Sequence, residues 1–410
     1  MAASVYSQFN NPWSKMVRIC CLSLWMVLYS VPLWSFDLPE NLQFHGFASQ
    51  GYNWTSNNNF FGHSQGNGSF DYTEIGANAS WLPFNNLQLS GQLLFRRAGE
   101  TDPQSLRLDY GLLDYTVLSD EANRWGIRVG RIKDPTGFYN ETRDVFFTRP
   151  SILLPQSIYP DYVRSLALSS DGFNIYGERH SDYGDFFLQA GIGYPDAVNR
   201  ELEPILFYYR VPGNFNSDLS YISRLLYEWH GGEIRAAITY FQANYHYNSG
   251  HSPSFPVSGG SLRIEPWILS LQYNAERWSL TTEYSLRTTR TNGFGQSSNI
   301  NTSEAYYFQG TYRILRDWEA LLRYDLLYAN KDDKNGHEFA AKNTLGLPAY
   351  SGYAKDWTIG LRWNVTPQFS LGIENHWVRG TAWLPPLDNP NPDDTKRNWD
   401  LLLFMGSYRF

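Results

Sequence analysis

Apolar and polar residues alternate with a period of two over most of the chain from Leu42 onward. In one such run, Trp278, Leu280, Thr282, Tyr284 and Leu286 alternate with Ser279, Thr281, Glu283, Ser285 and Arg287. Successive side chains of a β-strand point to opposite faces. Each run therefore predicts a strand with one apolar face and one polar, often charged, face.

About sixteen such runs follow one another along the chain. They lie near 42–54, 70–81, 87–96, 106–117, 124–132, 167–178, 184–194, 218–229, 233–247, 261–275, 277–290, 303–315, 317–329, 353–365, 368–379 and 397–410. The short separators are 83–86, 118–123, 179–183, 230–232, 276, 316 and 366–367, and the long ones are 55–69, 97–105, 133–166, 195–217, 248–260, 291–302, 330–352 and 380–396. Short and long separators alternate, so the two ends of the strands differ.

An even number of alternating strands with tight turns at one end and long loops at the other is the pattern of a transmembrane β-barrel. A soluble sandwich would not require this difference between its ends. Five tryptophans at the short-turn ends of strands, Trp81, Trp125, Trp278, Trp318 and Trp357, predict an interfacial aromatic girdle. The predicted fold is an all-β, 16-stranded antiparallel transmembrane β-barrel with short periplasmic turns, long extracellular loops and an infolded third loop.

The first 35 residues have the pattern of a secretory signal peptide. Lys15 and Arg18 precede an apolar run that ends at Val31, and Pro32 and the small residue Ser35 follow it. We therefore predict a signal segment over 1–35, with translation beginning at Met1 or Met16, and a barrel over 36–410. Both cysteines lie in the signal segment, so the mature chain has neither a disulfide nor a thiolate site.

The last strand ends in an aromatic residue and has hydrophobic residues at alternate positions before it. Counting back by twos from Phe410 gives Tyr408, Gly406, Phe404 and Leu402. This pattern resembles the recognition strand that outer-membrane proteins present to the barrel-assembly machinery. The resemblance implies that Leu402, Phe404, Tyr408 and Phe410 form that signal and that the protein resides in a bacterial outer membrane.

Composition and charge exclude several classes of function. The formal charge of −7 and the absence of a basic stripe give no support for binding nucleic acid. The eight histidines are scattered, and no nucleophile–base motif or zinc-binding motif is present. We therefore predict no enzymatic activity, no metal site and no cofactor.

The polar faces carry many charges, which would be costly in an apolar core. They include Arg96, Arg107, Arg224, Glu228, Arg235, Glu283, Arg287, Arg313, Glu319, Arg323, Asp325, Arg362, Glu374 and His376. Sixteen strands enclose an aqueous channel. The charges therefore predict a water-filled lumen and a pore for passive diffusion of small hydrophilic solutes.

The longest irregular stretch follows the fifth strand, at 133–166. The segment GRIKDPTG leads into it from the end of that strand, and NETRD, TRPS and LPQS lie within it. With the strand count, it makes the chain resemble the sixteen-stranded Gram-negative porins, whose third long loop folds into the lumen. The resemblance implies a pore constriction formed by this loop, a homotrimer, and contact with outer-membrane lipids and lipopolysaccharide.

Charged residues of the loop are the candidates for the constriction: Lys133, Glu141, Arg143, Asp144, Arg149, Asp161 and Arg164. Arg96 and Arg107 are the candidates on the facing pore wall. The excess of arginine favours anions mildly. Alternatively, these arginines pair with the loop's own acidic residues and only fix it to the wall. The alternative function is a substrate-specific channel for organic acids or sugars, followed by a surface adhesin or receptor, or an outer-membrane enzyme.

Overall fold

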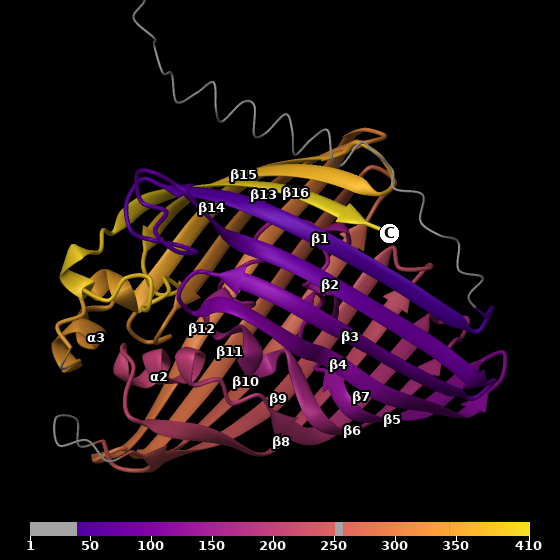
Figure 1. Cartoon of the computed structure of the whole chain (residues 1–410), viewed down its shortest axis with the longest axis horizontal. Coiled ribbons are helices and arrows are strands. Elements are labelled where there is room, and N and C mark those ends of the chain that lie inside the picture. The colour runs from indigo at the N-terminus through magenta and orange to yellow at the C-terminus, as the bar shows by residue number, and fades with distance from the viewer. Residues whose placement is uncertain (1–38, 251–256, 344) are drawn as a thin grey trace, which may run out of the picture. The chain divides into compact units, whose positions relative to one another are not determined.

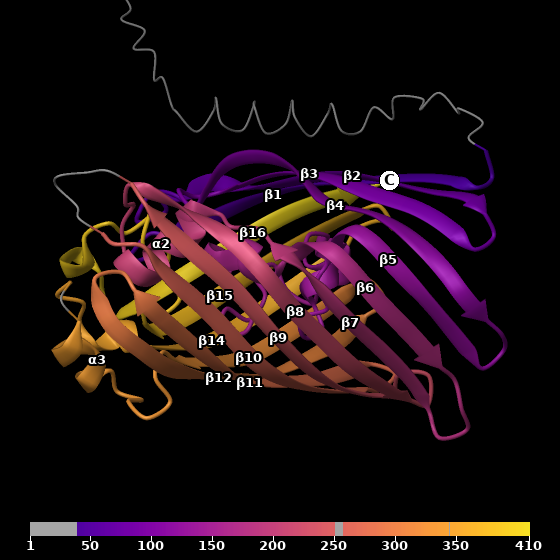
Figure 2. The ribbon, with the colours of Figure 1, turned by 90° about the horizontal axis from the view of Figure 1, so that it is seen from below.

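The computed structural model of the protein describes residues 39–250, 257–343 and 345–410. Within these residues, sixteen strands form one closed antiparallel barrel (Figure 1, Figure 2). The strands are β1 (Leu42–Thr55), β2 (Ser69–Phe84), β3 (Leu87–Ala98), β4 (Asp102–Ser119), β5 (Asn123–Lys133), β6 (Ser169–Arg179), β7 (Asp185–Pro195), β8 (Gly213–Trp229), β9 (Ile234–Ser249), β10 (Gly260–Asn274), β11 (Trp278–Gly293), β12 (Gln296–Leu315), β13 (Trp318–Tyr328), β14 (Tyr353–Asn364), β15 (Phe369–Gly380) and β16 (Asn398–Arg409). Each strand pairs with its neighbours in sequence, and β16 closes the barrel against β1. The predicted fold class is confirmed. The predicted signal segment lies outside the described residues.

The helices are short and lie in the loops. They are η1 (Asn140–Thr142), η2 (Phe146–Thr148), η3 (Asp161–Ala167), α2 (Asn199–Phe207), α3 (His337–Lys342), η4 (Ala349–Gly352) and η5 (Pro392–Asp394). Both α-helices lie at the end of the barrel away from the chain's C-terminus (Figure 1). No helix in the described part of the chain is long and apolar enough to cross a bilayer.

The connections differ at the two ends of the barrel, as predicted. One end has short turns, at 85–86, 120–122, 180–184, 230–233, 275–277, 316–317 and 365–368. The other end has the loops 56–68, 99–101, 134–168, 196–212, 250–259, 294–295, 329–352 and 381–397. We call 134–168 the lumen loop, and 56–68, 196–212 and 381–397 the first, fourth and eighth loops.

Two predicted long loops, 97–105 and 291–302, are wrong. Strands β11 and β12 continue to a tight turn at 294–295, where Phe294 and Gly295 both have positive φ (58° and 75°). Strands β3 and β4 continue similarly to 99–101. Strand residues that extend beyond a bilayer meet water on both faces. Alternation is therefore absent there, and the sequence resembles a loop.

The outer face of the barrel is apolar. On β10, Trp267, Leu269 and Leu271 are about half exposed, at 51%, 52% and 51%, whereas the alternating residues Ile268 and Ser270 are buried inside. Exposing this much apolar surface to water is unfavourable, and facing lipid is not. The outer face is therefore built for a lipid environment.

Four of the five predicted girdle residues, Trp81, Trp125, Trp278 and Trp318, lie at short-turn ends of their strands. The prediction is wrong for Trp357, which lies nearer the long-loop end of β14 and stacks on Tyr324. On β16, Phe404 and Tyr408 point outward and are exposed, and the terminal Phe410 is exposed as well. Leu402 shares their face and is partly buried. Their role as a barrel-assembly signal stays a prediction.

The prediction that the inner wall faces water is wrong for many of its charged residues. Arg96, Glu283, Arg323, Asp325, Glu374 and His376 are buried, at 0–4% exposure. The inner face of β16 is apolar, because Leu401, Leu403 and Met405 are buried in a cluster with residues of the first, lumen and eighth loops. A second cluster joins Leu202 of α2 to inward residues of β8, β9 and β10. Loops therefore fill much of the interior.

We expect Leu269→Arg to destabilise the barrel by about 2–4 kcal/mol, because it places a charge at mid-height on the lipid-facing surface. Urea unfolding of the protein in phospholipid vesicles measures this change. Tyr183→Arg, in an exposed turn (82% exposed), is the matched control and should change the free energy of unfolding little. Equal effects of both changes would contradict the lipid-facing assignment.

Candidate functional site

The lumen loop connects β5 to β6 and folds as short 3-10 turns separated by prolines. Every residue from 151 to 161 is buried, whereas Thr142 and Thr148 are exposed. Gly137 has a positive φ (57°), and a Cβ there would lie 2.2 Å from the hydroxyl oxygen of Tyr159, so only glycine fits. The loop is therefore a packed element of the interior.

Carboxylates of the inner wall accept hydrogen bonds from backbone N–H groups of the loop. Glu374 of β15 accepts from Ile152 and Leu153, and the Leu153 distance is 3.2 Å. Asp325 of β13 accepts from Ser157 at 3.2 Å. The irregular loop leaves these N–H groups without partners in a strand or helix, and buried N–H groups require an acceptor. These carboxylates therefore fix the backbone of the loop.

Glu283 of β11 accepts from the Phe138 backbone N–H at 3.1 Å and from the Tyr159 hydroxyl at 2.6 Å. Arginines of the wall act in the opposite sense by donating to loop carbonyls. Arg323 donates to Leu153 O at 2.9 Å, and Arg362 donates to Arg149 O at 2.5 Å. The loop is thus attached to β11, β13, β14 and β15 through its main chain.

On the other side of the lumen, the loop meets β2, β3 and β4 through charged side chains. Glu74 of β2 lies 3.0 Å from Arg149 Nη2 and 3.2 Å from Arg96 Nε. Arg96 of β3 also lies 2.5 Å from Asp161 and 3.2 Å from Asp102. All five side chains are buried. Hydrogen-bonded charged pairs are the arrangement in which such groups can be buried.

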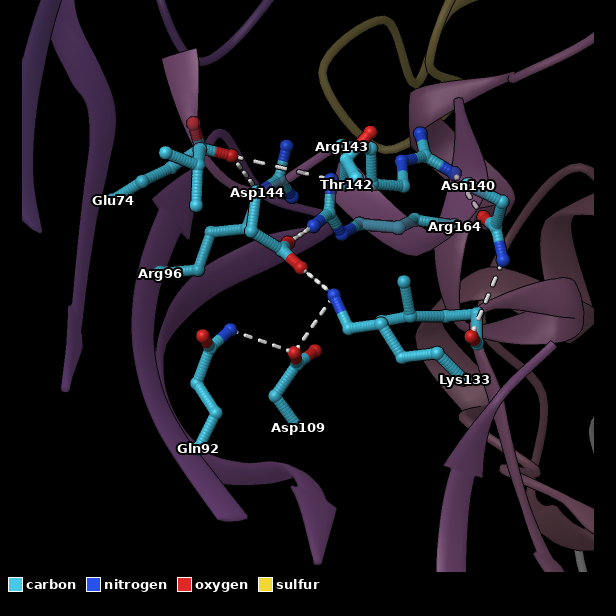
Figure 3. A network of polar contacts seen from close by, with 12 residues as sticks. Glu74, Gln92, Arg96, Asp109, Lys133, Asn140, Thr142, Arg143, Asp144 and Arg164 are labelled. Carbon is cyan, nitrogen blue, oxygen red and sulfur yellow. Dashed lines mark hydrogen bonds and ion pairs between the residues drawn. The ribbon is translucent and has the colours of Figure 1, made fainter. Parts of the chain in front are cut away.

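A second set of ion pairs continues this network toward β5 (Figure 3). The Lys133 ammonium lies between the carboxylates of Asp109, at 2.8 Å, and Asp144. Arg164 also pairs with Asp144, and Gln92 donates to Asp109 at 2.8 Å. Asp144 of the loop is therefore shared by two cations.

The structure brings most, but not all, of the predicted site residues together. Lys133, Asp144, Arg149, Asp161, Arg164 and Arg96 join the buried network, and Arg107 pairs with Asp102 at its edge, at 3.1 Å. Glu141 lies elsewhere: it is partly exposed and pairs with Arg224 of β8 at 2.7 Å.

Arg143 donates to Asn140 Oδ1 and Tyr159 O, and no carboxylate of the described residues lies within 4.0 Å of it. Burial lowers the pKa of Arg143. Burial, together with the neighbouring Arg143 and Arg96, lowers the pKa of Arg164 well below its usual value.

Sequence reasoning missed three acidic members of the site: Glu74, Asp102 and Asp109. Glu74 could have been found, because its neighbour Ile75 faces outward in the alternation of β2 and Glu74 therefore faces inward. The six predicted cations are Lys133, Arg96, Arg107, Arg143, Arg149 and Arg164, and six acids accompany them: Glu74, Asp102, Asp109, Glu141, Asp144 and Asp161. With Arg224, the partner of Glu141, the site has seven cations and six acids and a formal charge of +1.

The fourth loop packs on the lumen loop through α2. Both oxygens of Glu201 accept from Ser165, one from its N–H at 2.6 Å and one from its hydroxyl at 2.7 Å. The fourth loop also reaches the eighth loop, where the Tyr208 hydroxyl donates to Asn389 O at 3.1 Å. These two loops start eight strands apart, on opposite sides of the barrel.

Burial raises the pKa of several carboxyl groups in the loops, including Asp196 and Glu203. It raises the pKa of Asp134 to about 7, of Glu201 to about 7 and of Asp388 to about 6. Among the described residues, no group of three or more histidine, cysteine, aspartate or glutamate side chains could hold a metal ion.

We expect stability to depend on pH through Glu201. Its pKa is raised on folding, so its contribution is fully present below the pKa of the exposed carboxyl, about 4.5, and is lost as the pH rises through about 7. Glu201→Gln should remove up to about 3 kcal/mol of this pH dependence, measured by urea unfolding between pH 4.5 and 8. Glu338→Gln, on exposed α3, should leave the dependence unchanged.

Comparison of the sequence with protein-family models and with curated proteins gives no match. Solved structures match over 90% of the chain. The outer membrane channel DcaP of Acinetobacter baumannii matches over 97% of its own length, at 13% identity and a TM-score of 0.58. An anion-selective porin from Comamonas acidovorans matches over 99% of its length, at 10% identity and a TM-score of 0.57. OmpF of Salmonella typhi, in complex with daunomycin, matches over 97%, at 13% identity and 0.56.

At these identities the comparison establishes the fold. Each of the three structures is matched over nearly its whole length, as is the described barrel. Together with the closed order of sixteen strands, this confirms the predicted resemblance, and the chain has the fold of the sixteen-stranded outer-membrane porins.

Proposed function

We propose that the protein is a porin of a bacterial outer membrane that lets small hydrophilic solutes diffuse passively. The observation that carries this proposal is a closed sixteen-stranded barrel with an apolar outer face and a long charged loop inside it. A barrel of this strand number is wide enough for an aqueous channel. The names of two of the matching structures, an outer membrane channel and an anion-selective porin, support the same function.

The lumen loop is the proposed constriction, and most of the predicted site residues lie between the loop and the wall; Glu141 and Arg143 lie outside the buried network of ion pairs. With Arg224 included, seven cations face six acids there, which supports a mild preference for anions. Fixed charges in a narrow passage act on solutes through the local potential, and opposite charges at short range cancel much of it.

We propose a homotrimer in which the outer walls of neighbouring barrels are in contact. A trimer form is described for OmpT of Vibrio cholerae, which matches over 90% of this chain at 11% identity and a TM-score of 0.54. The remaining proposed partners are membrane lipids, lipopolysaccharide and the barrel-assembly machinery.

A substrate-specific channel for organic acids is the second candidate, favoured by arginines that stack on aromatic rings of the loop. Arg235 lies over Phe138 at 5.0 Å, and Arg409 lies over Phe147 at 4.3 Å. Arginine held in this way can bind a carboxylate. Saturable block of the conductance by one organic acid would favour this candidate, and block by none would exclude it.

We expect the purified protein to give stepwise conductance in a planar lipid bilayer, because a membrane-spanning aqueous channel conducts ions. The steps should come in groups of three if the protein is a trimer. Folded protein that never conducts would refute the channel function, and single steps would refute the trimer.

We expect Glu141→Gln to shift the reversal potential in a tenfold salt gradient by a few millivolts toward anion selectivity. Glu141 is partly exposed, so its charge acts on ions in the water-filled part of the lumen. Glu121→Gln, in an exposed periplasmic turn, is the matched control and should have no effect. An unchanged potential for Glu141→Gln would place the ion path elsewhere.

A further inference from the structure

Every strand of the barrel is covered over part of its inner face. Each of the sixteen strands has at least one inward-facing residue that is buried: Asn53, Glu74, Arg96, Asp109, Ile132, Asn174, Gly193, Leu226, Thr239, Ser270, Glu283, Tyr307, Arg323, Thr358, His376 and Leu403. No strand of the barrel therefore offers a fully wet inner surface along its whole length.

The segment of the lumen loop that covers the wall is itself buried. Residues 151–161 of the lumen loop are all buried, so they do not line an open passage. The loop touches opposite sides of the lumen: Asp161 pairs with Arg96 of β3, and Tyr159 donates to Glu283 of β11, eight strands away. A loop that only narrowed a pore would leave one of these walls free. This loop spans the lumen.

We propose that this is the closed state of the channel and that the lumen loop is its gate, held shut by Glu74. Glu74 is a positioning residue: it orients Arg149 and Arg96, and the Arg164 guanidinium approaches it at 3.9 Å. Three cations thus lie within 4.0 Å of the Glu74 carboxylate, which is fully buried. The inference rests on the proposed channel function and adds its regulation.

The chemistry of the two contact surfaces indicates which of them separates. Toward β15 the loop packs through apolar side chains, and a Cβ on Gly372 would lie 2.8 Å from the Phe146 ring and 3.2 Å from Ile152. Exposing that surface to water is unfavourable in proportion to its area. The β15 side therefore stays in place when the gate moves.

Toward β2 and β3 the contact consists of ion pairs. The Coulomb attraction within a buried ion pair is largely offset by the water that both partners lose. When the loop leaves this wall, water returns to both Glu74 and Arg149, so separation is far less unfavourable here than on the apolar side. The opened passage runs between the loop and β2–β4, lined by Glu74, Arg96 and Asp102.

Glu74→Gln tests the gate, because it removes the charge and keeps the size of the side chain. In planar bilayers we expect the fraction of time spent open to rise at least tenfold over the unmodified protein. Asp161→Asn, which removes the loop's partner of Arg96, is the second variant and should act in the same direction. Glu228→Gln is the matched control: it removes a wall carboxylate paired with Arg235 outside the network, and should leave the open fraction unchanged.

A labelling experiment tests the movement without conductance. Both native cysteines lie in the predicted signal segment, so Ala98→Cys places a single thiol in the mature chain, two residues from Arg96 on the inward face of β3, at a site that is 3% exposed. A water-soluble maleimide should label it at least tenfold faster in the Glu74→Gln background. Thr148→Cys, on the exposed part of the lumen loop, should label rapidly in both backgrounds.

The outcomes separate the gate from the channel function. If Glu74→Gln and Asp161→Asn, both shown to fold by their heat-modifiable mobility on gels, change neither open fraction nor labelling, the gate is refuted and the channel function stands. If no variant conducts, the channel function is refuted. In that case labelling of Ala98→Cys alone decides whether Glu74 holds the loop.

Discussion

Charged groups enclosed by the barrel need partners, and the rest of the structure depends on how they find them. Burying an ionised carboxylate without hydrogen bonds is prohibitively unfavourable. In this protein Asp325 and Glu374 accept from backbone N–H groups of the lumen loop, and Glu283 accepts from one such group and from three side-chain hydroxyls. The loop has no regular structure of its own to satisfy those N–H groups. Wall and loop therefore complete each other, and neither arrangement is stable alone.

The two sides of the lumen use different physical chemistry for the same contact. Main-chain hydrogen bonds and apolar packing fix the loop toward β11–β15, and both are sensitive to small displacements. Charged side chains join it to β2–β4, where Arg96 alone contacts three carboxylates. The contact with β11–β15 therefore persists, whereas the contact with β2–β4 can separate. The network of ion pairs on the β2–β4 side is close to neutral in charge.

Alternation in the sequence predicted the barrel well, because a period of two identifies strands and separates their faces. It placed fifteen of the sixteen strand starts within about five residues. It failed for the first residues of β12, at the long-loop end of the barrel, where both faces meet water and the period disappears. Alternation also identified Glu374 and His376 as inward-facing, but a face does not reveal what covers it. A carboxylate beside water and a carboxylate beside a loop N–H look alike in one sequence. The position of the loop inside the barrel could be predicted from its length and from its place after the fifth strand. The residues that it contacts could be identified only in the three-dimensional structure.

The inner face of β16 couples closure of the barrel to docking of the loops. Its residues Leu401, Leu403 and Met405 point inward, and its outer face is also apolar, with Phe404 toward the membrane. If β16 sealed the barrel before the lumen and eighth loops had docked, the inward row would face water. The final strand pairing during biogenesis is therefore coupled to insertion of the loops, and a late intermediate with an empty barrel would be short-lived.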